Sequence, residues 1–553
     1  MHDILLLNIV RDNSLNSSFL DCLGQHSIAS YLEIHGYVAR VFSGRTNEVK
    51  KIIDSQIKYS IKVVGFYVSA DNFNIAYNIA KWIKSNYDLK VIIGGSEAVS
   101  CNENFIRETG CDAVIESEGE EPVKRFLDYL NGKENLTNIP NLKYIDENNT
   151  FKRNPVTYFL ENLDDVPFPN NKNSLNAKFR QGNMVGILTG RGCPFSCSFC
   201  YEGANSKNVR FRSIPNVMAE IDYIIETNPN LVVINVYDDT FTLIKNRVYE
   251  FCDEIKKRNV FWVCEGHISN ILKYPEMLEY MVKSNLVGLQ IGIESGSDKV
   301  LDAYNKKTTS KDILEVVKIC KKAGLSSLTG NFIIGGAFED IDTFNESLSL
   351  AKNMIKEGRA MFEYRTVFLA PYPHTKISKN PEKFGLHPNK ELIEHSIYTM
   401  HNLVMSTDSL SIDDIYNLRI KFNTEIEKTY YEQIKYCTRK ELENSIMKNG
   451  KMVNRLFTWS EFYEKYEHIT CFIKNALHNK IAYNQEYYPI RTFCNPNYIA
   501  DYNVSDLEKE FLLLSDGKHS MYDISKILYL KTIQIQKIYY KLYERCFVYL
   551  SEF

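Results

Sequence analysis

A group of three cysteines within one short window constrains this chain more than any other feature. The window reads Cys193-Pro-Phe-Ser-Cys197-Ser-Phe-Cys200, and it follows the apolar run Met184–Thr189, which predicts a strand. The thiols therefore lie on a loop that leaves a strand end. Their spacing, three residues and then two, suits a four-iron–four-sulfur cluster held by three thiolates, the soft ligands that such clusters select.

No fourth cysteine lies near this window, so one iron of the cluster would lack a protein ligand and stay open for chemistry. A structural zinc site differs, because its four positions are normally all filled by protein side chains. The alternatives are a chance group of cysteines or part of a zinc site, and the loop context favours the cluster.

The composition indicates an ordinary soluble globular chain. Of its 553 residues, 44% are hydrophobic and 24% are charged, and the net charge is −3. We therefore expect roughly three or four domains and no general affinity for nucleic acid or membrane. No apolar run approaches a membrane span, and no signal peptide is expected at the start of the chain. The other cysteines are scattered singly, which predicts a reducing, cytoplasmic setting.

Residues 1–132 alternate strand-like and helix-like segments. The predicted strands are 4–10, 38–42, 63–67, 91–94 and 113–116, and the predicted helices include 17–33, 74–86 and 120–130. Short β-branched runs that alternate with helices predict an α/β fold with a doubly wound, Rossmann-like (flavodoxin-like) parallel sheet. Ligands of such sheets bind at the carboxyl ends of the strands. The polar and glycine residues expected there are Ser69, Asp71, Gly94, Gly95 and Glu118.

Residues 133–183 are predicted to be a polar connector, and alternation then resumes over residues 184–375. The predicted strands of this part are 184–189, 231–236, 261–264, 287–293, 327–334 and 364–369. These strand–helix units are too few for a closed eight-unit barrel, so we expect an open, partial (β/α)6 barrel of the TIM type. Active groups of such barrels lie at the carboxyl ends of the strands.

The remainder of the chain follows a different pattern. Residues 376–500 are predicted to be largely helical, in particular 385–450 and 459–486. Residues 501–553 predict a winged-helix-like module, with a helix, a turn at 515–518, two helices and a short strand at 546–550. Winged helices can bind DNA, but the charges here are mixed and form no basic stripe, so nucleic acid is not the expected partner.

Seven short blocks of sequence resemble the radical SAM superfamily, and in particular its members with an N-terminal cobalamin-binding domain. The blocks are Leu23–Leu32, Gly190–Cys200, Val209–Ser213, Tyr237–Thr242, Gly292–Asp298, Phe332–Gly336 and Ala370–His374. The resemblance implies that Cys193, Cys197 and Cys200 carry a four-iron–four-sulfur cluster. It also implies that the amino and carboxylate groups of S-adenosylmethionine (SAM) chelate the open iron.

The resemblance implies a SAM site around the cluster loop. It assigns Phe199, Phe332, Ile334 and Gly335 to the adenine, Asp238 or Asp239 to the amino group, Glu294 and Ser295 to the ribose, and Arg210 and Arg212 to the carboxylate. The alternatives are aromatic packing, helix capping and support of the cluster loop. Candidate catalytic residues near the substrate are His267, Tyr364 and Tyr372, each with a structural alternative.

The same resemblance implies that residues 1–132 bind cobalamin, with its nucleotide tail in the sheet and its corrin ring facing the barrel. The motif that supplies a lower axial histidine in other cobalamin proteins is absent. His26 follows the first strand, but in the sequence Gly24-Gln-His-Ser-Ile28, so we do not expect it to ligate cobalt. An unligated lower face would suit a cobalt that passes through a four-coordinate, nucleophilic state. The alternative is a degenerate domain kept as scaffold.

Together these features imply a cobalamin-dependent radical SAM enzyme that methylates an unactivated carbon of a natural product or peptide. In the resembling family, one SAM methylates the cobalt and a second yields a deoxyadenosyl radical that removes a substrate hydrogen. The substrate radical then takes the methyl group from methylcobalamin. The alternatives are a cyclase, cross-linking or rearranging enzyme without methyl transfer, and a non-catalytic corrinoid or redox-sensing regulator.

The expected partners are a small-molecule or peptide substrate and a reductant such as flavodoxin or ferredoxin. Residues 508–524 also resemble the winged-helix modules that recognise leader peptides of ribosomally made peptides. The alternative for this segment is a packing or lid role.

Overall fold

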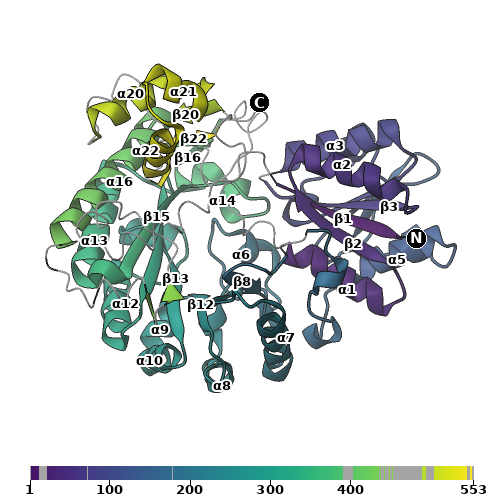
Figure 1. The fold of residues 1–553 in the computed structure, drawn as a ribbon, viewed down its shortest axis with the longest axis horizontal. Coiled ribbons are helices and arrows are strands. Elements are labelled where there is room, and N and C mark those ends of the chain that lie inside the picture. Colours follow the sequence, from purple (N-terminus) through teal and green to yellow (C-terminus); the bar gives the residue numbers. More distant parts are fainter. Residues whose placement is uncertain are drawn as a thin grey trace.

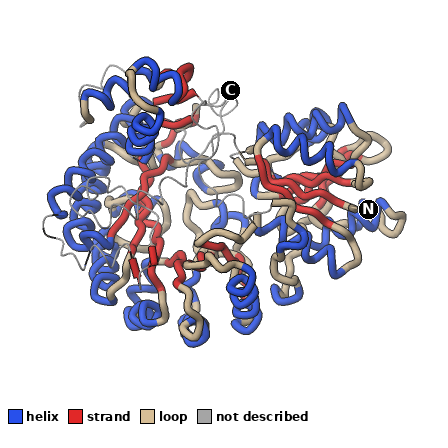
Figure 2. The backbone as a smooth tube through the Cα atoms, in the orientation of Figure 1, coloured by secondary structure: helices blue, strands red, loops and turns tan. Residues whose placement is uncertain are grey.

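The computed structural model describes residues 2–10, 22–70, 72–176, 179–389, 403–434, 436, 441, 447–448, 451–452, 489–492, 504–544 and 548–550. An N-terminal α/β domain lies beside an open barrel, and the C-terminal elements lie at the far side of that barrel (Figure 1). Helices cover the sheet of the first domain on both faces (Figure 2). In the part of the chain that the structure describes, no helix is long and apolar enough to span a membrane.

The N-terminal sheet has the strand order β2-β1-β3-β4-β5-β6-β7. Its strands are β1 (Ile4–Ile9), β2 (Ala39–Gly44), β3 (Val63–Tyr67), β4 (Lys90–Gly94), β5 (Ala113–Ile115), β6 (Leu142–Ile145) and β7 (Phe151–Arg153). The first five are parallel, and their order is the flavodoxin-like one. The predicted doubly wound sheet is thereby confirmed. Its ligand-binding switch point lies between β1 and β3.

Two apolar cores explain why the sheet is covered on both faces. One core joins the sheet to α2 (Thr46–Ile57), α3 (Phe73–Asn86) and α4 (Glu103–Thr109). The other joins it to α1 (Leu23–Ile34) and α5 (Glu120–Leu130). Because both faces of each central strand are buried, the strands read in the sequence as continuous apolar runs.

The predicted connector differs from the observed structure. Strands β6 and β7 pair antiparallel with the edge of the N-terminal sheet, so this sheet continues beyond residue 132. The segment then runs back along the first domain, where Ser174 bridges to Val41 of β2. Strand pairing between segments that are distant in sequence carries no local signal, which is why the polar composition suggested a plain linker.

The barrel sheet has the order β15-β14-β13-β12-β11-β8 and does not close. Its strands are β8 (Met184–Ile187), β11 (Val233–Val236), β12 (Phe261–Gly266), β13 (Leu286–Glu294), β14 (Ser327–Ile334) and β15 (Phe362–Phe368). All neighbours in it are parallel. The predicted partial barrel is thereby confirmed. Its outer layer is formed by α7 (Ile214–Thr227), α8 (Lys245–Ile255), α9 (Ile268–Lys273), α10 (Pro275–Lys283), α12 (Ser310–Ala323) and α13 (Ile341–Gly358).

The C-terminal part departs from the predicted helical region. Within 376–500 the structure describes α14 (Lys376–Lys379), the strand pair β16 (Leu386–Pro388) and β17 (Met405–Thr407), and α16 (Ile412–Ile434). Helix α16 packs on the barrel beyond β15, with Phe422 fully buried in the barrel core. The predicted helical stretch 459–486 lies outside the described residues.

The terminal module contains α20 (Asp506–Leu514), β21 (Asp516–Ser520), α21 (Met521–Ile527), α22 (Thr532–Glu544) and β22 (Val548–Leu550). The predicted turn at 515–518 is therefore mostly strand. Its sheet has the order β21-β20-β22, and the central strand β20 (Pro489–Thr492) precedes the predicted start of the module at residue 501.

A buried carboxylate on α7 ties the connector to the first barrel strand, and its removal should destabilise the barrel. Glu220 is fully buried between Arg180, at 2.6 Å, and Arg212. Glu220→Ala leaves two guanidinium groups without this partner, so we expect a loss of about 3–5 kcal/mol. The measurement is the apparent melting temperature. The control is Glu226→Ala, an exposed glutamate on the same helix, for which we expect a change within about 0.5 kcal/mol. Equal shifts in both variants would contradict the assignment.

Candidate functional site

The three cysteines lie on the loop between β9 (Gly190–Arg191) and α6 (Tyr201–Asn205), directly after the first barrel strand. Strand β9 pairs with β10 (Arg210–Phe211), so the cysteine loop is part of the segment that connects the two strands of an antiparallel hairpin. Gly192 is required at its start, because its φ is 87° and a Cβ atom there would lie 2.5 Å from the carbonyl oxygen of Asn208. The Cys193 thiol is buried, whereas Cys197 and Cys200 are partly exposed.

The turn after α11 (Asp298–Ala303) holds the cluster loop by three hydrogen bonds. The backbone N–H of Ser198 donates to the carbonyl oxygen of Tyr304 at 3.0 Å, and its hydroxyl donates to the carbonyl oxygen of Ala303 at 3.0 Å. The side-chain amide of Asn305 donates to the carbonyl oxygen of Ser196 at 3.0 Å. These three bonds attach the cysteine loop to the turn after α11.

Among the described residues, no three His, Cys, Asp or Glu side chains converge as ligands of a single metal ion. The three thiols are free, and burial raises the pKa of Cys193 and of Cys197. Three free thiols on one fixed loop fit the ligand set of an iron–sulfur cluster.

Of the two aspartates after β11, one binds the backbone just before the cysteine loop. Asp238 is buried and accepts hydrogen bonds from the backbone N–H groups of Thr189, at 2.6 Å, and Gly190, at 3.0 Å. Asp239 has an accessible side chain. Desolvation by the surrounding protein, together with the carboxylates of Glu202 and Glu265, raises the pKa of Asp239 to about 7. Asp239 is thus the member of the pair that is available to a cationic ligand.

Glu294 and Ser295 are both buried at the end of β13. Glu294 has a positive φ of 66° and pairs with the buried Lys306 at 3.1 Å. The Ser295 hydroxyl lies 3.0 Å from that of Ser347 and accepts from the backbone N–H of Ser297. The predicted ribose contacts are therefore already occupied by protein groups, which corresponds to the structural alternative for Ser295.

Lys306 is a site residue that the sequence did not reveal. Although burial acts in the opposite direction, the carboxylate of Glu294 and the sulfurs of Cys197 and Cys200 raise the pKa of Lys306. The structure thus places a fully charged, buried ammonium next to two of the three thiols. Nothing in the sequence Asn305-Lys-Lys307 distinguishes this lysine from its exposed neighbour, because its burial arises from the tertiary fold.

The residues of β14 and its end that were predicted to contact the adenine face the outer side of the barrel sheet, toward α16. Phe332 packs against Phe422 of α16, with ring centroids 5.1 Å apart, and Ile334 is fully buried in the same outer core. A Cβ atom at Gly335 would meet Ile415 of α16 at 2.6 Å. Because alternate residues of a strand point to opposite faces, it is Ile333 that joins the apolar cluster of Phe199.

Two of the three candidate catalytic residues lie away from the barrel interior or in a turn. Tyr364 stacks on Tyr430 and lies near Phe422, both of α16, so it faces outward. Tyr372 is in the turn after β15, where its carbonyl oxygen accepts from the Thr375 hydroxyl at 2.9 Å. The outward placement of Tyr364 does not support a role at the reacting atoms.

His267 does lie beside the cluster loop. Its ring stacks on Phe195, with centroids 3.7 Å apart, and its Nδ1 lies 2.7 Å from the Ser269 hydroxyl at the start of α9. Burial lowers the pKa of His267 to about 3, so the imidazole is neutral. Its Nε2 has no hydrogen-bond partner among the described residues. His267 is thus both a structural cap and a candidate donor toward a ligand.

The barrel interior carries a polar group that the sequence only partly indicated. Glu265 accepts a hydrogen bond from the Gln290 amide at 2.8 Å. Arg365 on β15 is exposed and interacts electrostatically with Glu265. Glu265 directly follows the predicted strand 261–264, but the period of β15 alone could not show which of its faces lines the interior.

Arg210 and Glu118, predicted for SAM and cobalamin respectively, bind each other. The Arg210 guanidinium pairs with Glu118 at 2.5 Å. Arg191, next to Gly192, pairs with the buried Glu120 at 2.7 Å and donates to the Ser27 hydroxyl at 3.1 Å. The cluster hairpin is therefore bound to the loop after β5 and to the first residue of α5 in the first domain. This corrects the prediction that Arg210 binds the SAM carboxylate.

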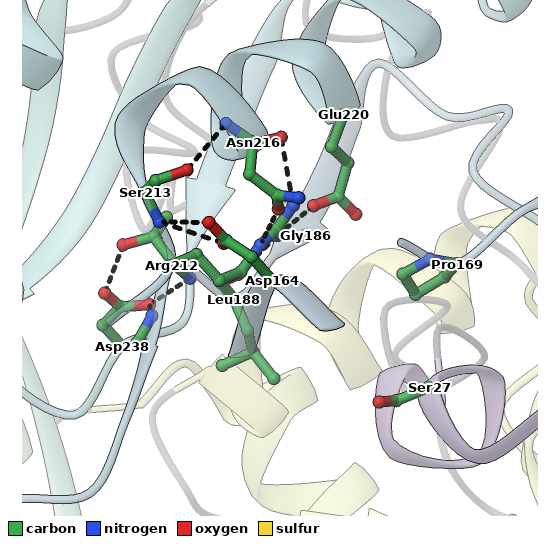
Figure 3. Close-up of polar contacts among 12 residues, drawn as sticks. Ser27, Asp164, Pro169, Gly186, Leu188, Arg212, Ser213, Asn216, Glu220 and Asp238 are labelled. Atoms are coloured by element: carbon green, nitrogen blue, oxygen red, sulfur yellow. Dashed lines mark hydrogen bonds and ion pairs between the residues drawn. The ribbon is translucent and has the colours of Figure 1, made fainter. Parts of the chain in front are cut away.

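Arg212 is committed to the barrel wall. Its guanidinium contacts Glu220 and Asn216 of α7 and donates to the carbonyl oxygen of Leu188 at 2.8 Å. Figure 3 shows this group, with Ser27 of α1 and Pro169 of the connector across from it. The alternative that Arg212 supports the cluster loop therefore fits the structure, and a contact with the SAM carboxylate does not.

A cavity of about 290 Å³ lies where the two domains meet. Of the five residues predicted to bind cobalamin, Gly94, Gly95 and Glu118 line it. Gly95 has a φ of 111°, and a Cβ atom there would lie 2.5 Å from the carbonyl oxygen of Val68, so only glycine fits. Ser69 does not line the cavity. Its backbone N–H donates a hydrogen bond to the side-chain oxygen of Asn72 at 2.8 Å. Asp71 lies outside the described residues.

His26 is not placed as an axial ligand. It is only 1% exposed, and its ring stacks on Phe179 of the connector with centroids 3.8 Å apart. Burial, reinforced by Arg180, lowers the pKa of His26 to about 3. The expectation that this histidine does not ligate cobalt agrees with its position under the connector.

Comparisons with known proteins agree with this geometry. Residues 187–351 match the family model of the radical SAM superfamily, and residues 20–127 match that of the B12 binding domain. The chain is 30% identical over 338 residues to the "Uncharacterized methyltransferase PH0819" of Pyrococcus horikoshii, covering 60% of this chain and 71% of that protein.

Two further likenesses are more distant. The chain is 22% identical over 358 residues to an anaerobic magnesium-protoporphyrin IX monomethyl ester cyclase of Rubrivivax gelatinosus, covering 59% of this chain and 61% of that protein. The solved structure of the cobalamin-dependent S-adenosylmethionine radical enzyme OxsB, with aqua-cobalamin and S-adenosylmethionine bound, superposes with a TM-score of 0.63. That match covers 98% of this chain and 79% of OxsB at 15% identity, so it shows the fold.

Glu265 should make the stability of the cofactor-free protein depend on pH. Burial raises the pKa of Glu265 to about 7, so the folded protein keeps a proton that the unfolded chain releases at a lower pH. Stability should therefore fall as pH rises from about 5 to 7, because the folded state binds more protons there. In Glu265→Gln this part of the decline should disappear, and Glu226→Gln should leave it unchanged. The measurement is the apparent melting temperature at several pH values. Parallel curves for Glu265→Gln and the unchanged protein would contradict the prediction.

Proposed function

The chain belongs to the radical SAM superfamily, in the group whose members also carry a B12-binding domain, and from this premise we propose that it is a cobalamin-dependent methyltransferase. Its target would be an unactivated carbon of a natural product or peptide. One observation carries the proposal. The hairpin with the three cysteines is bound by three ion pairs to the B12-binding domain, through Glu118 in the loop after β5 and Glu120 at the start of α5. Transfer of a methyl group between the two sites requires such proximity.

The residues around the cysteine loop fit a cluster with SAM. Cys193, Cys197 and Cys200 would hold the iron, and Asp239 would pair with the SAM ammonium group, since Asp238 is committed to the loop. Phe199, in one apolar cluster with Ile333, would lie against the adenine. When bound, the cluster and SAM supply the radical that removes a substrate hydrogen, and cobalamin supplies the methyl group.

The interdomain cavity suits the nucleotide tail of cobalamin. It is lined by the carboxyl ends of β3, β4 and β5, where ligands of this fold bind, and by Leu6 in the middle of β1. Gly94 and Gly95 allow a flat group to approach the backbone closely. The corrin ring would lie outside the cavity, toward the barrel, with no histidine of α1 available to its lower face because His26 is buried.

The barrel interior would hold a polar substrate. Arg365 and the Glu265–Gln290 pair line the side of the sheet opposite α16, and Arg365 is accessible. Water must leave this interior when a substrate binds, and the side chains then position the carbon that reacts. We propose that these three residues orient the substrate.

A second candidate function is a cyclisation or rearrangement without methyl transfer. It is favoured by the likeness to the magnesium-protoporphyrin cyclase over 59% of this chain. The same cluster, SAM site and barrel would serve it, so the two candidates differ in whether a methyl group leaves the corrinoid. The 30% identity to a protein named as a methyltransferase favours methyl transfer over cyclisation or rearrangement.

Further partners are part of the proposal. The cluster needs an external electron donor such as flavodoxin or ferredoxin, which implies a reducing setting, and the described cysteines are free thiols. The C-terminal module has β21 at the edge of its sheet. Edge strands can pair with an extended peptide, which supports the leader-peptide hypothesis for this module.

An anaerobic assay tests the proposed reaction. Reconstituted protein is given SAM, a reductant and hydroxocobalamin, and is then desalted. We expect retained corrinoid and formation of both deoxyadenosine and S-adenosylhomocysteine. The variant Cys197→Ala should lose iron and deoxyadenosine formation, whereas Cys320→Ala, a buried cysteine of α12 outside the site, should keep both.

Deoxyadenosine without retained corrinoid would contradict methyl transfer and favour the cyclase-type reaction. With an intact cluster and a range of candidate substrates, the absence of both products would contradict an enzyme and favour the regulator.

A further inference from the structure

Parts of the chain outside the B12-binding domain contribute to the walls of the interdomain cavity. Its floor comes from β1, β3, β4 and β5, and α1 contributes Gly24 and Gln25. The connector adds residues 166–169, and the barrel adds Leu188 and Arg191. Its volume of about 290 Å³ is near the lower end of small-molecule sites, so it suits a bicyclic aromatic base and not a corrin ring.

Most charged groups around this cavity are already paired within the protein. Glu120 binds Arg191 and the Ser27 hydroxyl, and Glu220 binds Arg180 and Arg212. A neutral ligand therefore suits the cavity better than a charged one, since no free charge among its described lining residues awaits a counter-ion.

Gln25 is the neutral polar lining residue with a buried donor that lacks a partner in the described part of the chain; the Nε of Arg180 also lacks one, but the Arg180 guanidinium is paired with Glu220. The Gln25 side chain lies on the first turn of α1, is only 6% exposed, and lines the cavity. Its Nε2 has no hydrogen-bond partner among the residues that the structure describes. A buried donor without a partner is unfavourable, and a ligand atom that accepts a hydrogen bond would remove that penalty.

We propose that Gln25 recognises the nucleotide base of the corrinoid tail, by donating a hydrogen bond to a ring nitrogen, and thereby makes the protein selective for complete corrinoids. The inference rests on the proposed corrinoid binding. A neutral amide suits a neutral aromatic nitrogen, and the apolar walls suit the faces of the ring. Because the connector and the barrel complete these walls, both domains take part in the selection.

The test compares cobalamin with cobinamide, which has the corrin ring but lacks the nucleotide. Both are titrated into the full-length protein carrying its cluster, and the dissociation constants are read from visible absorption. We expect cobinamide to bind at least about tenfold more weakly. Gln25→Leu should weaken cobalamin binding by about 3–10-fold, the range for one hydrogen bond, and should leave cobinamide within about twofold.

Ser30→Ala is the matched control. Ser30 is on the same helix, is 1% exposed, and its hydroxyl also lacks a partner among the described residues, but it does not line the cavity. The substitution should change neither dissociation constant. A general effect of replacing buried polar groups on α1 would instead appear in both variants.

Filling the cavity provides a second, independent variant. Gly24 lines the cavity, and a Cβ atom there meets no other atom within 4 Å. Gly24→Phe should therefore lower cobalamin binding to the level of cobinamide without affecting cobinamide. Iron content and the cluster absorption report whether each variant is folded.

The outcomes separate this inference from the function on which it rests. Equal binding of cobalamin and cobinamide by the unchanged protein would overturn the selectivity and leave corrinoid binding intact. Weakening of both ligands by Gln25→Leu in a folded protein would overturn the contact with the base. Binding of neither corrinoid would overturn the corrinoid part of the proposed function, and the inference with it.

Discussion

The site depends on the ion pairs that join the cysteine hairpin to the B12-binding domain. Arg191 and Arg210 lie on the two strands of the hairpin, Glu118 lies in the loop after β5, and Glu120 is the first residue of α5. Although burial opposes it, the Arg191 guanidinium lowers the pKa of Glu120, so this pair stays charged. Buried ion pairs add little net stability, but they penalise any arrangement in which one partner is left alone. They thus fix how the two domains meet.

The same interface explains why Glu118 and Arg210, each predicted to contact a cofactor, contact each other instead. Glu118 lies at a carboxyl strand end, where a sheet of this type binds its ligand, and Arg210 follows the cysteine loop. Each position alone suggested a contact with a different cofactor. Because the loops meet, the two side chains neutralise each other, and the space between the domains remains as the cavity beside Ser27 and Pro169 (Figure 3).

Much of the fold could be predicted because local sequence patterns determine where its buried strands lie. Continuous apolar runs predicted the five parallel strands and the six barrel strands, since both kinds of strand are buried on two faces. The antiparallel strands β6 and β7, and the strand β20 that completes the terminal module, were missed. They are short and partly polar; β6 and β20 become strands by pairing with distant segments, and β7 pairs with β6 across a short turn.

The sequence by itself determined the chemistry of the site, because the spacing of Cys193, Cys197 and Cys200 and the glycines at strand ends are local requirements. Only the tertiary structure decided which neighbours serve that chemistry. The face of β14 toward the interior, which favours Ile333 over Phe332, is set by the packing of α16. The burial of Lys306 beside the thiols, and of Gln25 beside the cavity, likewise arises from contacts between segments far apart in sequence, which no local pattern encodes.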